Sequence, residues 1–143
     1  MLLISKSELL ISEVLKLKKS GNVINFVPTM GNLHDGHVSL VREAKKNNQV
    51  CLVSIFVNPL QFENINDFND YPRTWESDKL CLLGEKVDLL FTPDKEFLEQ
   101  KNYFLKLGNI AKKLCGKDRK GHFEGVSEVI IKFLKLIEPN SII

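Results

Sequence analysis

The 143-residue chain has little cysteine, and its thiols follow no metal-binding or redox spacing. Cys51, Cys81 and Cys115 are odd in number and widely separated, with no C-x-x-C pair and no mixed Cys/His cluster. A disulfide framework and a zinc site are therefore not expected. We predict reduced thiols and a cytoplasmic protein.

Long hydrophobic runs and a strong charge excess are also missing. The apolar N-terminus, MLLISKSELLISEVL, is interrupted by Lys6, Glu8 and Glu13, which excludes a signal-type core and a membrane-spanning helix. The net charge is only +2, too small to indicate nucleic acid or an anionic membrane as a partner. The basic cluster over residues 112–120 is interpreted as a solvated loop. We expect neither a nucleic-acid nor a membrane partner.

The remaining pattern is an alternation of helical and extended segments in one globular domain. Apolar periodicity predicts helices over residues 5–20, 38–48, 74–83 and 126–137, and strands over 23–27, 50–57 and 87–91. Ser5 and Glu8 fit a capping box, residues 58–74 are expected to form a loop, and a short strand at 103–107 stays open. Such alternation is typical of an α/β fold with an open, doubly wound parallel sheet.

The last residues after Pro139 read NSII, which resembles the start of a further strand. A βαβ pattern that stops on entering a strand suggests a cut within a domain. We therefore expect residues 1–143 to be part of a longer fold.

The segment PTMGNLHDGH holds two of the three histidines, His34 and His37, between a predicted strand and a predicted helix. Ligands of open α/β sheets bind at the carboxyl ends of strands, and a helix N-terminus attracts anions. Gly31 and Gly36 would let the backbone approach a ligand closely. The segment predicts a phosphate site, where imidazoles would stabilise charge on phosphate oxygens. Two alternatives stay open, namely surface loop histidines and a half-formed metal site.

The segment FVNPLQF follows the next predicted strand and opens onto the same edge of the sheet. Asn58 and Gln61 offer amide donors and acceptors beside the apolar Phe62. This combination suits a small hydroxy acid, whose polar groups need hydrogen bonds and whose carbon skeleton needs cover. The alternative is a turn at Asn58-Pro59 with a solvated Gln61.

The third histidine lies in KDRKGHFEGVSEV, between two glycines and ahead of the last predicted helix. Arg119 could reach a phosphate or carboxylate if this loop folds over the site. The alternative for Arg119 is a solvated side chain. His122 stays open between a structural and a functional role.

Together these segments resemble the pantothenate synthetase (pantoate–β-alanine ligase) family of the HxGH nucleotidyltransferase superfamily. PTMGNLHDGH, SIFVNPLQF, YPRT, KVDLLFTP and GHFEGVS match the family pattern in order and spacing, from Met1 to Asn140. HxGH alone would leave other adenylyltransferases and class I aminoacyl-tRNA synthetases open, but the combined motifs are specific to this family.

The resemblance implies a Rossmann-like domain of a cytoplasmic homodimer, followed by a smaller C-terminal domain. It also implies a two-step reaction. ATP and pantoate would give pantoyl adenylate and pyrophosphate, and β-alanine would then give pantothenate and AMP. Magnesium would accompany ATP.

The resemblance also assigns site residues by position. It implies catalytic roles for His37, as the proton donor, and for His34. ATP binding falls on Pro28, Thr29, Met30, Gly31, His34, Gly36 and His37. Pantoate and β-alanine contacts fall on Gln61, Asn58 and Phe62, while Arg119 and His122 are possible loop contacts. The metal ligands are unknown. Glu76 and Asp78 are candidates, although an exposed helix N-terminus explains acidic residues equally well.

Two segments of the family pattern are not present in these 143 residues. One is an FGEKD…Q segment and the other is a later loop with serine and arginine, both of which would contact ATP. We therefore expect residues 1–143 to be an incomplete N-terminal ATP- and pantoate-binding domain. The alternatives are a non-catalytic module that binds ATP or dimerises, and an adenylyltransferase of another HxGH branch.

Overall fold

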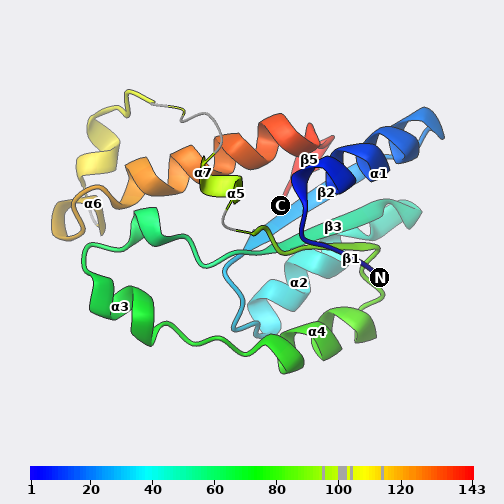
Figure 1. The fold of residues 1–143 in the computed structure, drawn as a ribbon, viewed down its shortest axis with the longest axis horizontal. Helices are drawn as coiled ribbons and strands as arrows, with labels where there is room; N and C mark the ends of the chain where they lie inside the picture. Colours follow the sequence, from blue (N-terminus) through cyan, green and yellow to red (C-terminus); the bar gives the residue numbers. More distant parts are fainter. Residues whose placement is uncertain (95, 100–102, 104, 114) are drawn as a thin grey trace.

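The computed structural model describes residues 1–94, 96–99, 103, 105–113 and 115–143. Its centre is a five-stranded sheet in the order β1-β4-β3-β2-β5, with every pair of neighbouring strands parallel (Figure 1). The strands are β1 (Leu2–Ile4), β2 (Ile24–Thr29), β3 (Val50–Ile55), β4 (Leu89–Phe91) and β5 (Ser141–Ile142). The predicted open parallel sheet is confirmed.

Helices connect the strands in the expected α/β order. The α-helices are α1 (Ser7–Lys19), α2 (Asp35–Ala44), α3 (Ile65–Asp70), α4 (Trp75–Gly84), α5 (Glu96–Glu99), α6 (Cys115–Asp118) and α7 (His122–Ile137). The short 3₁₀ helices among the described residues are η1 (Lys46–Asn48), η2 (Pro59–Gln61) and η3 (Asn109–Lys112). None of these helices has the length and apolar character needed to cross a membrane.

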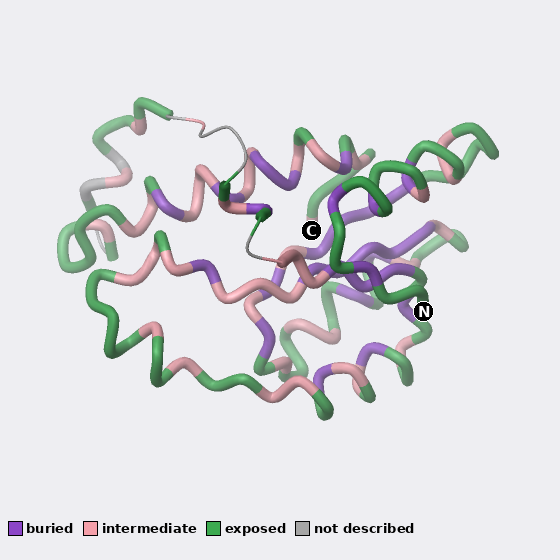
Figure 2. Tube along the Cα trace, viewed as in Figure 1, coloured by how far each residue is buried: buried purple, intermediate pink, exposed green. Residues whose placement is uncertain are grey.

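The sheet is buried on both faces, which explains the almost uninterrupted apolar runs of β2 and β3. Successive strand side chains point to opposite faces, so Phe26 and Val27 enter different hydrophobic clusters. Figure 2 shows the central strands as the buried part of the chain. One cluster includes side chains of α1, α5 and α7, and the other includes side chains of α2 and α4. The fold is therefore doubly wound.

The register of β2 and β3 determines where a ligand site can form. The two strands pair over six positions, from Ile24↔Val50 to Thr29↔Ile55, so their carboxyl ends are level. The loops after both strands consequently start at the same edge of the sheet. α7 then leads into β5, which pairs with β2 on its other side. The strand expected to begin after Pro139 is thus confirmed.

Several predicted boundaries are wrong, because tertiary contacts override short sequence patterns. β1 was not predicted, since three residues carry no periodicity, yet it pairs with β4 along one edge. α1 begins at Ser7 with Lys6 as its N-cap and no side-chain cap, so the capping box is wrong. β3 ends at Ile55 rather than at residue 57. In the range 103–107, residue 104 lies outside the described residues, and the described ones are not in a strand.

The predicted loop over 58–74 contains two short helices instead, η2 and α3. Asn58 caps η2 by accepting a hydrogen bond from the Leu60 N–H, and Asn64 caps α3 by accepting one from the Asp67 N–H. Asparagine is common in turns and equally favourable as a helix N-cap. The composition of this segment therefore could not separate a loop from short capped helices.

Candidate functional site

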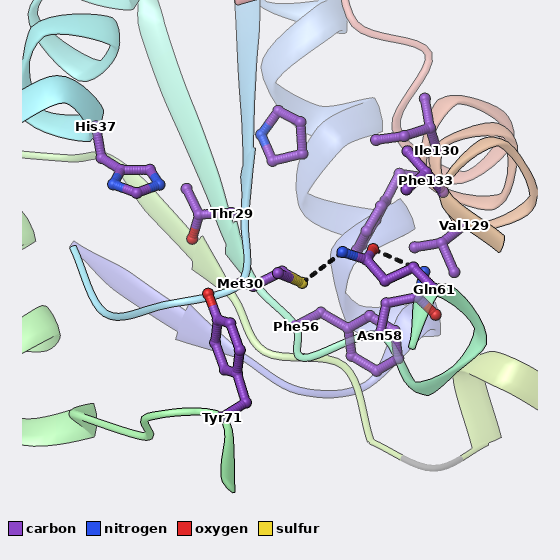
Figure 3. Close-up of a pocket in the computed structure, with 12 residues that line it drawn as sticks. Thr29, Met30, His37, Phe56, Asn58, Gln61, Tyr71, Val129, Ile130 and Phe133 are labelled. Carbon is purple, nitrogen blue, oxygen red and sulfur yellow. Dashed lines mark hydrogen bonds between the residues drawn. The ribbon is translucent and has the colours of Figure 1, made fainter. Parts of the chain in front are cut away.

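A cavity of about 280 Å³ lies where the carboxyl ends of β2 and β3 meet α7 (Figure 3). Its walls come from the β2 end, the start of α2, the β3 end with η2, the segment before α4, and the apolar face of α7. The lining residues are Pro28, Thr29, Met30, His37, Phe56, Asn58, Gln61, Tyr71, Val126, Val129, Ile130 and Phe133. The cavity combines a large apolar wall with a few polar groups, as small-molecule sites do.

The structure brings about half of the predicted site residues to this cavity. Pro28, Thr29, Met30, His37, Asn58 and Gln61 line it, whereas Gly31, His34, Gly36, Phe62, Arg119 and His122 do not. Residue-level reasoning missed Tyr71, Phe56 and the four residues of α7. Tyr71 belongs to the YPRT motif, which was noticed without a role for the tyrosine. The α7 residues have ordinary core periodicity, which gives no signal of a cavity.

His34 and His37 cap the N-terminus of α2 with their own imidazoles. The His34 Nδ1 accepts a hydrogen bond from the Gly36 N–H at 3.1 Å, and the His37 Nδ1 accepts one from the His34 N–H at 3.4 Å. The two ring centroids are 4.2 Å apart. Local packing explains why residue 36 is a glycine, because a Cβ there would lie only 2.8 Å from the His34 ring. The glycine therefore makes room for the imidazole.

In this capping geometry the His37 Nδ1 accepts a hydrogen bond, so Nε2 is the nitrogen of that ring that can donate. A neutral imidazole that accepts at Nδ1 carries its proton on Nε2. Partial burial lowers the pKa of His37 below its ordinary value, the neighbouring His34 lowers it further, and Asp78 acts in the opposite sense. His37 is therefore neutral near pH 7 and presents an Nε2–H donor at the cavity.

Asp78 of α4 holds the histidine loop in place. Its carboxylate accepts the Asn32 N–H at 3.0 Å and the Leu33 N–H at 2.9 Å, and the Thr74 hydroxyl donates to both of its oxygens at 3.1 Å. Asp78 is only 3% exposed. Gly31 has φ +79°, and a Cβ there would lie 3.0 Å from Asp78 Oδ2. This glycine thus lets the loop pack against a carboxylate of the protein.

The same contacts bear on the two candidate magnesium ligands. The Asp78 oxygens already accept bonds from two backbone amides and a hydroxyl, so this carboxylate acts as a loop anchor. Glu76 is exposed in the first turn of α4. The described part of the chain contains no cluster of three or more His, Cys, Asp or Glu residues suited to a metal ion.

A buried amide network orients Gln61 at the β3 end of the cavity. The Asn58 Nδ2 donates to the Gln61 Oε1 and to the Gly125 carbonyl, both at 3.1 Å. Asn58 is 2% exposed, and both ends of the Gln61 amide have protein partners, unlike the alternative of a turn with a solvated Gln61. With its oxygen occupied, Gln61 directs its Nε2 at the Met30 Sδ, 2.9 Å away (Figure 3).

Side chains at and just before the start of α7 contact the backbone carbonyl of Gln61. α7 begins at His122, so His122 lies on a helix rather than on the predicted loop. The His122 Nδ1 is 2.9 Å from the Gln61 carbonyl oxygen, and the Arg119 Nη2 donates to that oxygen at 3.5 Å. Both side chains therefore contact the backbone of η2, and neither lines the cavity. This contact is of the structural kind, which is one of the two roles that the sequence leaves open for His122.

Phe62 takes part in the site indirectly. Its ring packs edge-on against Phe68 of α3 and Tyr71, with centroid distances of 5.5 and 5.7 Å. The Arg73 guanidinium donates to the carbonyls of residues 68, 69 and 71 and thereby closes the end of α3. Phe62 and Arg73 thus position Tyr71, which lines the cavity in place of Phe62.

Gly125 permits the close approach of α7 to η2. A Cβ on Gly125 would lie 2.1 Å from the Leu60 carbonyl oxygen and 2.8 Å from the Gln61 nitrogen, both of which are backbone atoms. We expect Gly125→Ala to lower the free energy of unfolding by about 1–3 kcal/mol, because overpacking against backbone has a cost in this range. Urea denaturation of the two chains measures the difference.

Gly84→Ala is the matched control. Gly84 also lies in a helix, as the last residue of α4, but an added Cβ would meet no atom within 4 Å. Alanine is the better helix former, so this variant should be as stable as the parent or more stable by up to about 1 kcal/mol. Equal effects of the two substitutions would show that the α7–η2 approach is not tight.

Sequence comparison with known proteins gives a consistent family. The model of the Pantoate-beta-alanine ligase family matches residues 3–143. The pantothenate synthetase of Buchnera aphidicola subsp. Schizaphis graminum is 44% identical over 142 residues, which cover 96% of this chain and 50% of the relative. The pantothenate synthetase of Carboxydothermus hydrogenoformans is 47% identical over 130 residues, covering 89% and 46% of the two chains.

Solved structures agree in fold as well as in sequence. The crystal structure of pantoate-beta-alanine ligase from Francisella tularensis, complexed with beta-gamma ATP and beta-alanine, has a TM-score of 0.90 at 40% identity. The match covers 99% of this chain and 55% of the chain in that crystal structure. Pantothenate synthetase from Thermus thermophilus has a TM-score of 0.87 at 35% identity, with 99% and 51% covered. The chain spans about half the length of these relatives, and it belongs to the pantoate-beta-alanine ligase family.

Proposed function

We propose that residues 1–143 form the ATP- and pantoate-binding domain of an enzyme that condenses pantoate with β-alanine, through a pantoyl adenylate, to give pantothenate. The observation that carries this proposal is the cavity on which the α2 N-terminus, the His37 imidazole and the Gln61 amide converge. Family membership supports the same reaction, and the relative from Francisella tularensis was solved with beta-gamma ATP and beta-alanine.

In the first step, a pantoate carboxylate oxygen attacks the α-phosphorus of ATP and pyrophosphate leaves. The segment Met30–His37 is proposed to bind the nucleotide phosphates. The start of α2 contributes its dipole, and the neutral His37 contributes an Nε2–H donor aimed at the cavity. Such preorganised donors stabilise the charge that grows on phosphate oxygens in the transition state. His34 is exposed, and we propose that it acts on the outer phosphates and by holding the His37 ring.

Pantoate is proposed to lie between Gln61 and the apolar wall of α7. The Gln61 Nε2 would donate to an oxygen of the hydroxy acid, and Asn58 maintains the orientation of Gln61. Val129, Ile130 and Phe133 would cover the carbon skeleton. This arrangement holds the nucleophile beside the phosphate and thereby favours direct in-line displacement.

In the second step, the β-alanine amine attacks the acyl carbon of pantoyl adenylate and AMP leaves. Both steps are displacements without a covalent enzyme intermediate. Burial raises the pKa of the Cys51 thiol to about 12, so this cysteine is not a competing nucleophile. Gln61 is proposed to contact β-alanine in its turn. Magnesium is proposed to enter with ATP as the substrate complex, held chiefly by the phosphates.

The test is an isotopic measurement of pyrophosphate release from ATP, with and without pantoate and in the absence of β-alanine. The expected result is release that depends on pantoate and on magnesium, followed by AMP and pantothenate when β-alanine is added. Nucleotide binding without pantoate-dependent release would favour the alternative of a non-catalytic ATP-binding module. Release with another acceptor in place of pantoate would indicate a different HxGH branch.

Two further properties stay predictions. The free state of all three cysteines agrees with the proposed cytoplasmic location, which immunolocalisation of the native protein would test. The proposed homodimer is checked by light scattering, with a molar mass twice that of the chain as the expected result.

A further inference from the structure

Met30 lies at the boundary between the substrate cavity and a second, smaller cavity. The second cavity has a volume of about 190 Å³. Ile55, Val57 and Trp75 line it together with Arg73, Thr74 and Asp78, and the surface that these residues expose to it is almost wholly apolar. Met30 lines both cavities. A protein cavity of about 150 Å³ can hold a benzene molecule, so the second cavity has room for the end of a methionine side chain.

The hydrogen bond that holds the Met30 side chain at the substrate cavity is weak. The Gln61 Nε2 donates to the Met30 Sδ at 2.9 Å, and a thioether sulfur is only a weak acceptor. Gln61 cannot simply turn its oxygen to this position, because the Asn58 Nδ2 donates to that oxygen. Asn58 is itself held by the Gly125 carbonyl and the Leu60 N–H. The donor is therefore fixed, while its partner is flexible and replaceable.

We propose that Met30 is a displaceable plug that a hydroxy acid pushes from the Gln61 amide into the apolar cavity beside Trp75. An oxygen of the ligand replaces a weak acceptor with a strong one, which favours the exchange. Methionine suits this role because its unbranched side chain has three rotatable bonds and adapts to irregular space. Met30 thereby acts as a specificity-determining residue, since a purely apolar ligand gains nothing by displacing it.

The identity of the hydroxy acid as pantoate rests on the proposed function, whereas the two positions of Met30 do not. Two experiments separate these points. The chain contains two methionines and one tryptophan. Labelling with [methyl-13C]methionine therefore gives two signals, from the exposed Met1 as an internal control and from Met30. The indole of Trp75, the single tryptophan, lines the second cavity, so its ring current shifts the Met30 methyl signal when that methyl group enters the cavity.

The first experiment uses the ligand-free Gln61→Glu variant. A glutamate keeps the oxygen that Asn58 contacts but has no N–H for the Met30 sulfur. We expect the Met30 methyl signal to shift upfield through the Trp75 ring current and to acquire a nuclear Overhauser contact with the indole. Gln49→Glu is the matched control, because Gln49 precedes the amino end of β3, opposite the end that carries the cavity, and its side-chain oxygen accepts a hydrogen bond from Asn25. This variant should leave the signal in place. An unchanged Met30 signal in Gln61→Glu contradicts the proposal that Met30 is a displaceable plug.

The second experiment adds pantoate to the parent chain, with binding followed by calorimetry. The expected result is the same upfield shift of Met30 in proportion to bound pantoate. Binding without movement of Met30 overturns the coupling between ligand and plug. An absence of binding, together with movement in Gln61→Glu, leaves the plug standing and refutes pantoate as its ligand.

A third variant blocks the destination of the plug. Val57 lines the second cavity but not the substrate cavity, so Val57→Phe is expected to fill part of the second cavity and Val57→Ala to enlarge it. We expect Val57→Phe to weaken pantoate binding by about tenfold or more, because the Met30 side chain would then have to enter space that is already filled. Val57→Ala should bind at least as tightly as the parent. Equal affinity of both variants contradicts the proposal.

Discussion

Replacement of His37 by alanine is expected to lower pantoate-dependent pyrophosphate release by about 10²–10³-fold while leaving the fold intact. The physical reason is the loss of a neutral Nε2–H donor at the cavity, and removal of one preorganised donor has an effect of this size in an acyl-transfer site. His37 is only partly buried, so its loss should change the free energy of unfolding little. The measurement is isotopic pyrophosphate release by the complete gene product, with urea denaturation alongside.

Two amide variants separate the role of the His37 Nδ1 acceptor from that of the Nε2–H donor. Asparagine at position 37 can still accept the His34 N–H but presents no donor where Nε2 stood. Glutamine is longer and can place an amide N–H near the Nε2 position. We therefore expect His37→Asn to be as slow as His37→Ala, and His37→Gln to recover part of the rate. Near-normal turnover in His37→Ala would remove this residue from the proposed mechanism.

Replacement of Asp78 by alanine is expected to lower the free energy of unfolding by about 3 kcal/mol or more. The substitution leaves the Asn32 and Leu33 amides without their acceptor and removes the partner of the Thr74 hydroxyl. Hydrogen bonds to a charged group contribute about 1.5–3 kcal/mol each, and a buried amide without an acceptor adds a desolvation cost. Urea denaturation measures the loss, and pyrophosphate release should fall with it because the histidine loop is no longer held.

Glu76→Ala is the control on the same helix. Glu76 is exposed in the first turn of α4, so its removal should change the stability by no more than about 0.5 kcal/mol. A loss below about 1 kcal/mol in Asp78→Ala would contradict the anchoring role. Asp78→Asn should fall between parent and alanine, since an amide retains one acceptor oxygen but turns a donor toward the other backbone N–H.

The local chemistry of the site was readable from short segments, because each segment combines a strand end with the residues that follow it. The continuous apolar run of β3 indicates a parallel strand covered on both faces. Pro28 marks the end of β2 approximately, since the strand continues to Thr29 rather than ending at residue 27 as predicted. Once two parallel strands are neighbours, their carboxyl ends lie at one edge, and His37 and Gln61 follow those ends. Their convergence on one cavity is therefore a consequence of local pattern and sheet geometry.

The supporting contacts were not readable, because they join residues that are distant along the chain. Asp78 reaches the histidine loop across 46 positions, and His122 reaches the Gln61 carbonyl across 61. An acidic residue in the first turn of a helix and a histidine between glycines have the same local appearance whether they are solvated or anchored. Only the packing of α4 and α7 against the sheet decides between these states.

For this protein, the alternation of the longer helices with strands β2, β3 and β4, the α/β class and the family follow from residue patterns alone, because they depend on periodicity and on motifs within single segments. The tertiary structure decides the rest: that β1 forms an edge strand, that His122 supports rather than lines the site, and that Met30 lies between two cavities. These features depend on side-chain packing between distant segments, and no local sequence pattern encodes that packing.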